Sequence, residues 1–477
     1  MMLTVASFIV FLGIFFIIGL ASVAKSKGTK SDYYLADQSI SPLMSGLSAV
    51  ATNNSGYMFI GVIGYTYTVG LAAIWLMIGW IMGDFLASLF IHQQLHRATV
   101  RTGEASYTGV LARWTGGNML MWRRIAALLI LIFLGAYAAA QISAGSKALE
   151  GVLGWNKTIG AWMVALMVLS YSVAGGIRAS IWTDVAQSVV MLAAMVVLVL
   201  SGVMAFGGVS SVIHAWQAIP GYFDLAPQSL ALPGLMGIVL FSLGWLVAGL
   251  SVIGQPHIMV RFMALNDANS INVARIYYYG FFILFYALAT IAGMLARLHL
   301  PALNQLDPEL ALPTMAVQLL PPALVGVVLA GIFAATMSTA DSLVLSCSAV
   351  ITHDLLPQSA ERQMTIKLVT GAVTGLALMI ALYASSNVFD LVIMSWSVMA
   401  AAFGPILILF ALNRQMVESI AIVVMAIGVL VALLWRYANL HHMVYEGLPA
   451  MLIALLIGYL LSKKTASHYS ITNRELP

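Results

Sequence analysis

The sequence contains very little charge. Only 8% of its 477 residues are Asp, Glu, Lys or Arg, whereas soluble domains carry about 25%. Hydrophobic residues make up 61% of the chain, and the mean hydropathy is +0.98. A water-soluble protein of this length could not cover its surface with so few charges. We therefore expect an all-α integral membrane protein, with residues 1–477 forming one transmembrane domain.

Cysteine is almost absent as well. The single cysteine, Cys347, excludes an intramolecular disulfide and a cysteine-based metal cluster. The nine histidines form no HExxH-type motif. A polytopic membrane enzyme, one alternative function, therefore has no visible catalytic constellation. A transporter-like solute sensor is the second alternative, and we see no segment long enough to be a fused kinase.

Apolar runs long enough to cross a bilayer are what the sequence does contain. A spanning helix needs about 20 apolar residues. The sequence predicts thirteen transmembrane helices, at about residues 3–23, 43–64, 69–91, 125–146, 158–176, 185–206, 234–256, 276–296, 321–352, 366–384, 388–412, 416–435 and 447–462.

The basic residues alternate between the two ends of these predicted spans. Of the 21 Lys and Arg residues, 17 fall on one side, and only Lys147, Lys157, Arg297 and Arg436 fall on the other. Because the positive side faces the cytoplasm, we expect an outside N-terminus and a cytoplasmic C-terminus in the plasma (inner) membrane. Topology accounts for the pI near 9.0, so no nucleic-acid partner is expected.

Polar residues cluster inside the second predicted span. Thr52, Asn53, Asn54, Ser55 and Gly56 follow one another at membrane depth. Asn and Gly are poor helix formers, and unwinding here would free carbonyls to bind a cation. A small-residue helix interface is the other reading, and the pattern alone does not separate the two.

A second break is predicted at the end of the seventh span. Pro256 removes a backbone donor and disfavours helix at Gln255, and Gly254 adds backbone freedom. An ordinary kink or helix end would give the same residues. Spans two and seven are five apart, which is the separation of the first helices in two inverted five-helix repeats.

The ninth span carries hydroxyl groups on one face. Ala335, Ser338, Thr339 and Ser342 are spaced i, i+3, i+4 and i+7. Oxygen atoms in this arrangement suit a hard monovalent cation, although small-residue packing would also produce it. Asp341 weighs against packing alone, because a carboxylate at this depth is costly without a partner.

Two other acidic residues lie within or against spans. Asp184 opens the sixth predicted span, where it could cap the helix or take part in ion coupling. Asp84 lies in the third span, and we expect it to pair with a nearby arginine.

Taken together, these motifs resemble the sodium:solute symporter family, which includes the bacterial sodium/proline symporters. The resemblance covers about residues 3 to 460. The matching stretches are Leu47–Gly56, Gly175-Gly176, Trp182-Thr183-Asp184 with Gln187, Gly254–Ile258, Arg261-Phe262-Met263, Ala335–Thr339 and Thr352-His353-Asp354.

The resemblance implies the LeuT-type fold, with inverted repeats at about 43–206 and 234–412 and peripheral helices at 3–23, 416–435 and 447–462. It implies sodium-coupled symport by alternating access, with no obligate protein partner. The implied sodium ligands are Ala51, Asn54, Ala335, Ser338 and Thr339. A second sodium site would use Asp184, Asp341 and Ser342, although Asp341 departs from the small hydroxyl residue expected there.

The resemblance also implies a solute pocket. Its expected lining is Asn53, Ser55, Tyr57, Tyr137, Gln141, Gln255 and Pro256. Proline symporters look to carry Asp where Asn53 stands and Trp where Tyr57 stands. The change from carboxylate to amide alters the hydrogen bonds that the pocket offers. We expect a small polar solute, either an amino acid such as proline or a small carboxylate.

Overall fold

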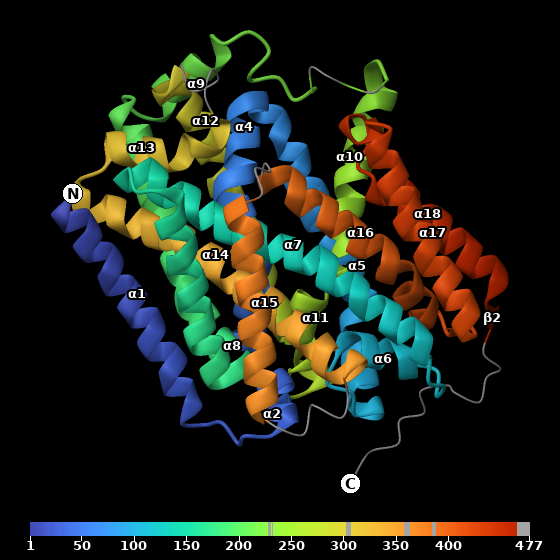
Figure 1. Ribbon diagram of the computed structural model, residues 1–477. Helices are drawn as coiled ribbons and strands as arrows, with labels where there is room; N and C mark the ends of the chain where they lie inside the picture. The colour runs from blue at the N-terminus through green and yellow to red at the C-terminus, as the bar shows by residue number, and fades with distance from the viewer. Residues whose placement is uncertain (228–229, 231, 302–306, 357–362, 384–387, 465–477) are drawn as a thin grey trace.

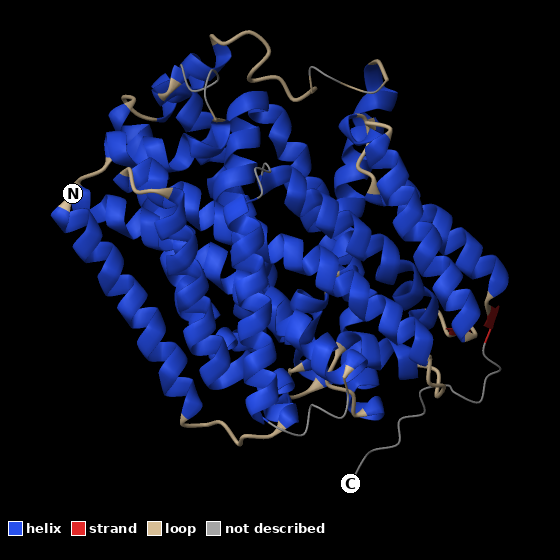
Figure 2. Ribbon diagram, viewed as in Figure 1, coloured by secondary structure: helices blue, strands red, loops and turns tan. Residues whose placement is uncertain are grey.

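The computed structural model describes residues 1–227, 230, 232–301, 307–356, 363–383 and 388–464. Nearly all of this part is helical, and one two-residue antiparallel pair joins β1 (Arg414–Gln415) to β2 (Lys463–Lys464) (Figure 2). The α-helices are α1 (Met2–Val23), α2 (Lys30–Leu35), α3 (Pro42–Asn53), α4 (Ile63–Val69), α5 (Ile74–Thr102), α6 (Tyr107–Arg113), α7 (Leu120–Leu153), α8 (Lys157–Ala205), α9 (Val209–Gln217), α10 (Gly234–Leu250), α11 (Pro256–Met263), α12 (Ile271–His299), α13 (Ala311–Leu319), α14 (Pro322–Val350), α15 (Gln363–Tyr383), α16 (Val388–Ala411), α17 (Glu418–Tyr437) and α18 (Gly447–Leu461).

Each of the thirteen predicted spans coincides with helix in the described residues. By length and composition, however, ten helical stretches of the described chain can cross a membrane, so the predicted number is not confirmed. The difference has three causes. Residues 57–102 and 157–205 each form one continuous helical stretch, α3 is only 12 residues long, and α18 is only 15.

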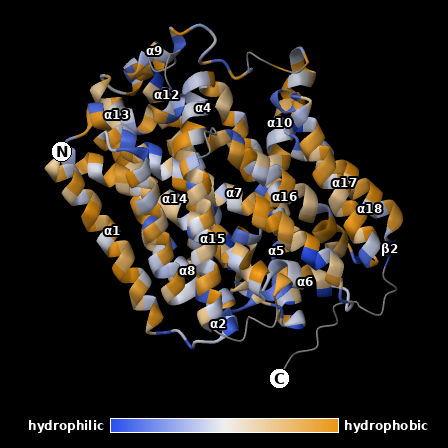
Figure 3. Cartoon of the chain, in the orientation of Figure 1, coloured by the Kyte–Doolittle hydropathy of each residue, from blue (hydrophilic) through white to orange (hydrophobic). Residues whose placement is uncertain are grey.

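The helices form a single bundle around α14. This helix packs against α7 and α8, and its residues are almost all buried. Helix α1 lies at one edge of the molecule, and α17 and α18 lie at the opposite edge (Figure 1). Hydrophobic residues cover the outer helices along their length, as a lipid-facing surface requires (Figure 3).

The two ends of the bundle differ in the elements that they carry. Helices α9 and α4 lie at the upper end in Figure 1, with the N-terminus near α13, while α2, α6 and β2 lie at the lower end. The loop before α2 contains Lys25 and Lys27, and α6 ends at Arg113. The basic residues near these elements therefore belong to one end of the bundle.

Both predicted helix breaks are present. Helix α3 starts with Pro42 behind the N-cap Ser41 and ends at Asn53, where Asn54 has φ −81° and ψ 56°. A π-helical segment, Tyr57–Val62, continues the span toward α4. In the seventh span, a 3-10 turn ends at Gly254, Gln255 is extended, and Pro256 begins α11.

Candidate functional site

The first cluster joins the broken end of α3 to the middle of α14. The Ser338 hydroxyl lies 3.1 Å from both the Ala51 carbonyl and the Ala335 carbonyl, and the Thr339 hydroxyl donates to the Thr52 carbonyl at 2.8 Å. All of these residues are fully buried. The structure therefore brings together four of the five predicted sodium ligands, and it adds Thr52, which was noted in the polar cluster but not predicted as a ligand.

Asn54 lies directly after α3, at the break. It is fully buried, and neither its amide oxygen nor its amide nitrogen has a hydrogen-bond partner. Leaving both polar atoms of a buried amide unpaired is costly. The Ala51 and Ala335 carbonyls and the Ser338 hydroxyl form a set of oxygen atoms of the kind that can hold a hard monovalent cation.

A second buried cluster surrounds the Arg261 side chain of α11. Its guanidinium donates to the hydroxyls of Ser180 at 2.7 Å, Ser48 at 3.3 Å and Ser342, and it forms an ion pair with Asp184 at 3.4 Å. The Ser48 hydroxyl also donates to Asp184 at 2.6 Å. Arg261 thus links α3, α8 and α14 in one network.

Asp341 belongs to the same network. Its Oδ1 accepts hydrogen bonds from Ser180 at 3.1 Å and Ser342 at 2.9 Å. One carboxylate oxygen on Asp341 and one on Asp184 have no partner. The three residues predicted for a second sodium site are therefore neighbours. Ser48, Ser180 and Arg261 were not predicted as site residues, although a basic residue beside a helix break, in a stretch that matches the family, was a usable signal.

The structure rules out one sequence-based alternative for Asp184. Helix α8 runs from Lys157 to Ala205, so Asp184 lies well inside it and does not cap a new helix. The break between the fifth and sixth predicted spans falls earlier, at Gly176, whose φ is 57° and ψ −143°. Glycine adopts this conformation at little steric cost, so the helix restarts well before Asp184.

Several predicted solute-pocket residues meet at the unwound stretch after α3. The Ser55 hydroxyl lies 3.2 Å from the Tyr137 hydroxyl, and the Gly56 N–H donates to the Gln141 side chain at 2.9 Å. Gln255 instead donates to the Trp396 carbonyl at 2.9 Å, with its own amide oxygen unpaired. These residues therefore present free amide atoms beside an irregular backbone.

An aromatic cluster surrounds Tyr57. Its ring lies 5.2 Å from Phe389 and 5.8 Å from Trp80, and Trp80 lies 5.2 Å from Trp396 and 6.2 Å from Trp245. The Tyr57 hydroxyl is buried and has no partner. Large aromatic faces with a few free polar atoms are typical of small-molecule sites. Apart from Tyr57, none of these aromatic residues was predicted.

Asn53 was predicted to line the solute pocket, but its amide contacts other groups. It donates to Asp84 at 3.1 Å and to the Tyr278 hydroxyl at 2.5 Å. The expected pairing of Asp84 with an arginine is wrong. In the described chain its partners are Asn53, Tyr278 and Tyr279, and it has no ion pair.

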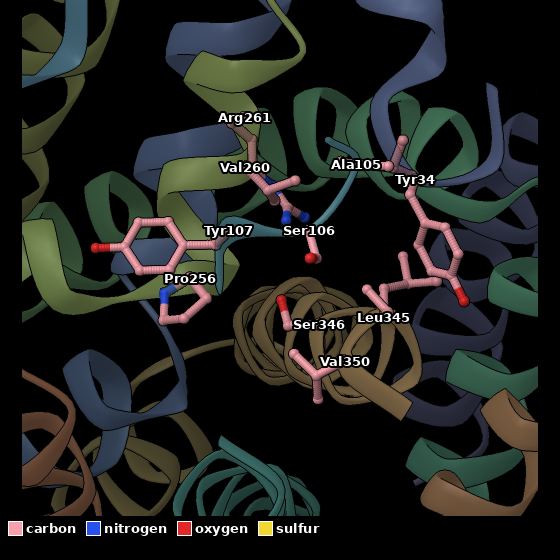
Figure 4. A pocket seen from close by; sticks show the side chains of 12 residues that line it. Tyr34, Ala105, Ser106, Tyr107, Pro256, Val260, Arg261, Leu345, Ser346 and Val350 are labelled. Carbon is pink, nitrogen blue, oxygen red and sulfur yellow. The ribbon is translucent and has the colours of Figure 1, made fainter. Parts of the chain in front are cut away.

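A hollow opens at the end of the bundle that carries α2 and α6. It encloses about 410 Å³ of empty space, open solvent included. Tyr34, Ser106, Pro256 and Ser346 line it, and the Arg261 guanidinium points toward it (Figure 4). Pro256 therefore faces this hollow, and the hollow leads to the side chain that contacts Asp184.

A transition-metal centre finds no support in the described residues, which contain no group of three or more His, Cys, Asp or Glu that could hold such an ion. Carbonyl and hydroxyl oxygens dominate the α3–α14 cluster. A broken helix whose buried carbonyls face hydroxyls at membrane depth is typical of a secondary transporter that couples an ion to a solute.

Comparisons with known proteins agree with this class. The model of the sodium:solute symporter family matches residues 33–428. The chain is 28% identical to the high-affinity proline transporter PutP of Bacillus subtilis, covering 92% of this chain and 93% of that protein. It is 29% identical to the sodium/proline symporter of Staphylococcus aureus, covering 95% and 91%.

Solved structures show the same fold. A Na⁺-coupled sialic acid symporter in a substrate-bound outward-open state superposes with a TM-score of 0.82 at 18% identity, covering 97% of this chain and 99% of that one. The nucleobase-cation-symport-1 transporter Mhp1 gives 0.58 at 15% identity, covering 89% and 92%. The chain belongs to the sodium:solute symporter family. It has the LeuT-type fold and is a multi-pass, sodium-coupled transporter of a small solute, not an enzyme.

Proposed function

We propose that sodium binds where α14 meets the broken end of α3. The supporting observation is the contact of Ser338 with the Ala51 carbonyl and of Thr339 with the Thr52 carbonyl. Ala335 and Asn54 complete the ligand set. Residues 43–206 and 234–412 form the two inverted repeats in this proposal, so the bound ion connects one repeat to the other.

Sodium and solute are coupled by linkage in this mechanism. Sodium favours the arrangement in which α3 and α14 are joined, and the same arrangement assembles Ser55, Tyr137 and Gln141 at the break. Each ligand therefore raises the affinity of the other by the same factor. The inward sodium gradient and a negative interior drive the cycle, at about 2.3 kcal/mol per charge per 100 mV.

A second sodium ion is proposed at Asp184, Asp341 and Ser342. Support comes from the unpaired carboxylate oxygens of both acids and from the contacts of Asp184 and Ser342 with Arg261, which lines the hollow. Arg261 occupies part of the same oxygen set. In this proposal, the site would be the first to exchange ions with the solution on the side of the bundle that carries α2 and α6.

For the solute, we propose a small amino acid, with proline as the first candidate and a small carboxylate as the second. The names of the relatives support proline, and so does the aromatic cluster around Tyr57. The lining would be Asn53, Ser55, Tyr57, Tyr137, Gln141, Gln255 and Pro256. Asp84 supplies a carboxylate next to Asn53 from a neighbouring helix, so the loss of an acid at position 53 does not argue against an amino acid.

The test is uptake of labelled L-proline, other amino acids and small carboxylates into proteoliposomes, with and without an inward sodium gradient. We expect gradient-driven uptake of one of these solutes. The Ser338→Ala, Thr339→Ala double variant should lose it, because two of the proposed ligands are removed. A matched control is Ser170→Ala with Thr290→Ala, whose hydroxyls bond only to their own helices. Uptake that ignores sodium, or survives the first double variant, contradicts the proposed site.

We propose that the N-terminus is outside the cell and the C-terminus in the cytoplasm. The charge distribution and the position of α2 and α6 at one end of the bundle support this orientation. The hollow beside Arg261 then opens to the cytoplasm.

A further inference from the structure

Eight acidic side chains are buried in the described part of the chain, and six of them have a basic partner. Asp32 pairs with Arg178, Glu104 and Asp354 with Arg123, Asp184 with Arg261, Glu309 with Lys147, and Glu446 with Arg436. Asp341 shares the Ser180 and Ser342 hydroxyls with Arg261. Asp84 is the exception, because it has neither an ion pair nor a hydroxyl shared with a cation.

The partners of Asp84 are all neutral. Tyr278 donates to Oδ2 at 2.7 Å, Tyr279 to Oδ1 at 2.7 Å, and the Asn53 amide to Oδ2 at 3.1 Å. Asp84 is fully buried, in the middle of a transmembrane helix. An intramembrane carboxylate without a counter-charge is expensive, and such groups commonly mark ion or proton pathways.

These partners can serve either protonation state. A guanidinium has only donors, so it stabilises the ionised acid alone. A phenol both donates and accepts, and an amide carries one donor group and one acceptor. If Asp84 takes up a proton, its new O–H can donate to Tyr278 or to the Asn53 amide oxygen. The new O–H therefore has acceptor groups among the neighbours of Asp84, which an acid held only by arginine lacks.

The other charged and titratable groups nearby are directed elsewhere. Arg275 of α12 donates to Asn272 and to the Ser88 carbonyl. His92 of α5 stacks on Phe262 of α11, and His96 contacts the Phe262 carbonyl. His257 of α11 faces Tyr137. The remaining titratable group of α11, Arg261, pairs with Asp184, and helices α3 and α10 contain no titratable side chain.

The cluster is connected to the proposed sodium site through α3. Asn53 is the last residue of that helix, directly before the break, and it follows Ala51 and Thr52, whose carbonyls contact Ser338 and Thr339. A change in the hydrogen bonds of Asn53 therefore acts on the backbone that holds the cation ligands. Protonation of Asp84 and sodium binding at these carbonyls share one structural element.

We infer that Asp84, with Asn53, Tyr278 and Tyr279, is a proton-binding site of the transport cycle, separate from both sodium sites. A proton adds to one carboxylate oxygen of Asp84 and leaves it again, without any other bond change. The chain thus responds to protons as well as to sodium, whichever solute it carries.

Infrared difference spectra between acidic and alkaline buffer, recorded on the purified protein in lipid, test this inference directly. A protonated carboxylic acid has a C=O stretching band that a carboxylate lacks. We expect the wild-type protein to gain this band on acidification. Asp84→Asn should lose it, and Asp84→Glu should shift it, because the longer side chain changes its surroundings. The matched control is Asp224→Asn, an exposed acid in the loop before α10, which should leave the buried band unchanged.

Two outcomes would overturn the inference. One is a buried-acid band that is identical in the wild-type protein, Asp84→Asn and Asp84→Glu. If Asp84→Asn does not fold, the comparison of the wild-type protein with Asp84→Glu still tests the inference. The other is loss of radioactive sodium binding in Asp84→Asn at alkaline pH, which would make Asp84 a sodium ligand. Sodium binding that is retained, at wild-type or at shifted affinity, supports the separate proton site, and it does so even if no transported solute has been identified.

Discussion

Asp341 determines the charge of the Arg261 cluster. With both carboxylates ionised, Asp184 and Asp341 exceed the single guanidinium by one negative charge. A serine at position 341 would leave Asp184 and Arg261 as a neutral pair. The unpaired oxygens on both acids then attract a monovalent cation more strongly than a hydroxyl would.

We expect Asp341→Asn to weaken sodium binding at the second site. The sodium concentration for half-maximal uptake should rise about tenfold, which corresponds to about 1.4 kcal/mol. The maximal rate at saturating sodium should change less. Sodium titration of uptake measures this effect, with Asp224→Asn as the control. An unchanged sodium dependence would mean that Asp341 has a structural role.

Single-residue roles were predictable from sequence only in part. Hydroxyl spacing predicted that Ser338 and Thr339 share one face of a helix, because helix periodicity fixes which residues share a face. It did not reveal that Thr339 contacts Thr52, or that Asn53 turns toward Asp84, because these contacts depend on how neighbouring helices are rotated and staggered.

Helix α8 is held to α2 where its two halves meet. Arg178 pairs with Asp32 at 2.5 Å. Burial acts to raise the pKa of the Asp32 carboxyl, but hydrogen bonds from Arg178, the Lys27 backbone and Ser26 outweigh it and lower the pKa. Two residues before Arg178, Gly176 has a positive φ, and a Cβ there would lie 2.4 Å from the Tyr33 carbonyl oxygen.

A substitution at this break should therefore destabilise the protein. We expect Gly176→Ala to lower the free energy of unfolding by about 2 kcal/mol or more, since both the backbone conformation and the close approach disfavour a side chain. Gly375→Ala is the matched control, because its Cβ would meet nothing within 4 Å. Thermal unfolding in detergent compares the two variants, and equal melting temperatures would contradict this account of the break.

The breaks themselves were readable from sequence because Gly, Asn and Pro weaken helices through local backbone effects. The effect of these breaks on where the helices end and restart could not be predicted from the sequence. The Gly175-Gly176 pair was visible as a motif, yet the continuation of helix through Asp184 was not expected, because contacts with α2 and α14 determine where α8 restarts.

For the whole molecule, composition and apolar runs were enough to predict a helical membrane bundle, whereas the LeuT-type fold was implied by the resemblance of the motifs to a known family. The number of spans was less certain, because helices that follow each other almost directly, such as the π-helical segment through α5, have no polar loop to separate them. The hollow beside Arg261 offers a direct test of the proposed orientation.

Ser346 lines this hollow and is partly exposed, whereas the adjacent Cys347 is buried. In a Cys347→Ala background, we expect Ser346→Cys to react with a membrane-impermeant maleimide added to the cytoplasmic side of oriented vesicles, and not from the outside. A cysteine at Ser211 in α9 should show the opposite sidedness. Labelling of Ser346→Cys from outside only would reverse the proposed orientation.

The tryptophans in the aromatic cluster around Tyr57 make solute binding measurable by intrinsic fluorescence. Trp80, Trp245 and Trp396 lie near one another and near the unpaired Tyr57 hydroxyl. Indole emission depends on the polarity and packing of its surroundings, so a solute that enters among these rings changes the fluorescence of the unlabelled protein. Occupancy can then be followed in real time, in lipid and without radioactive substrate.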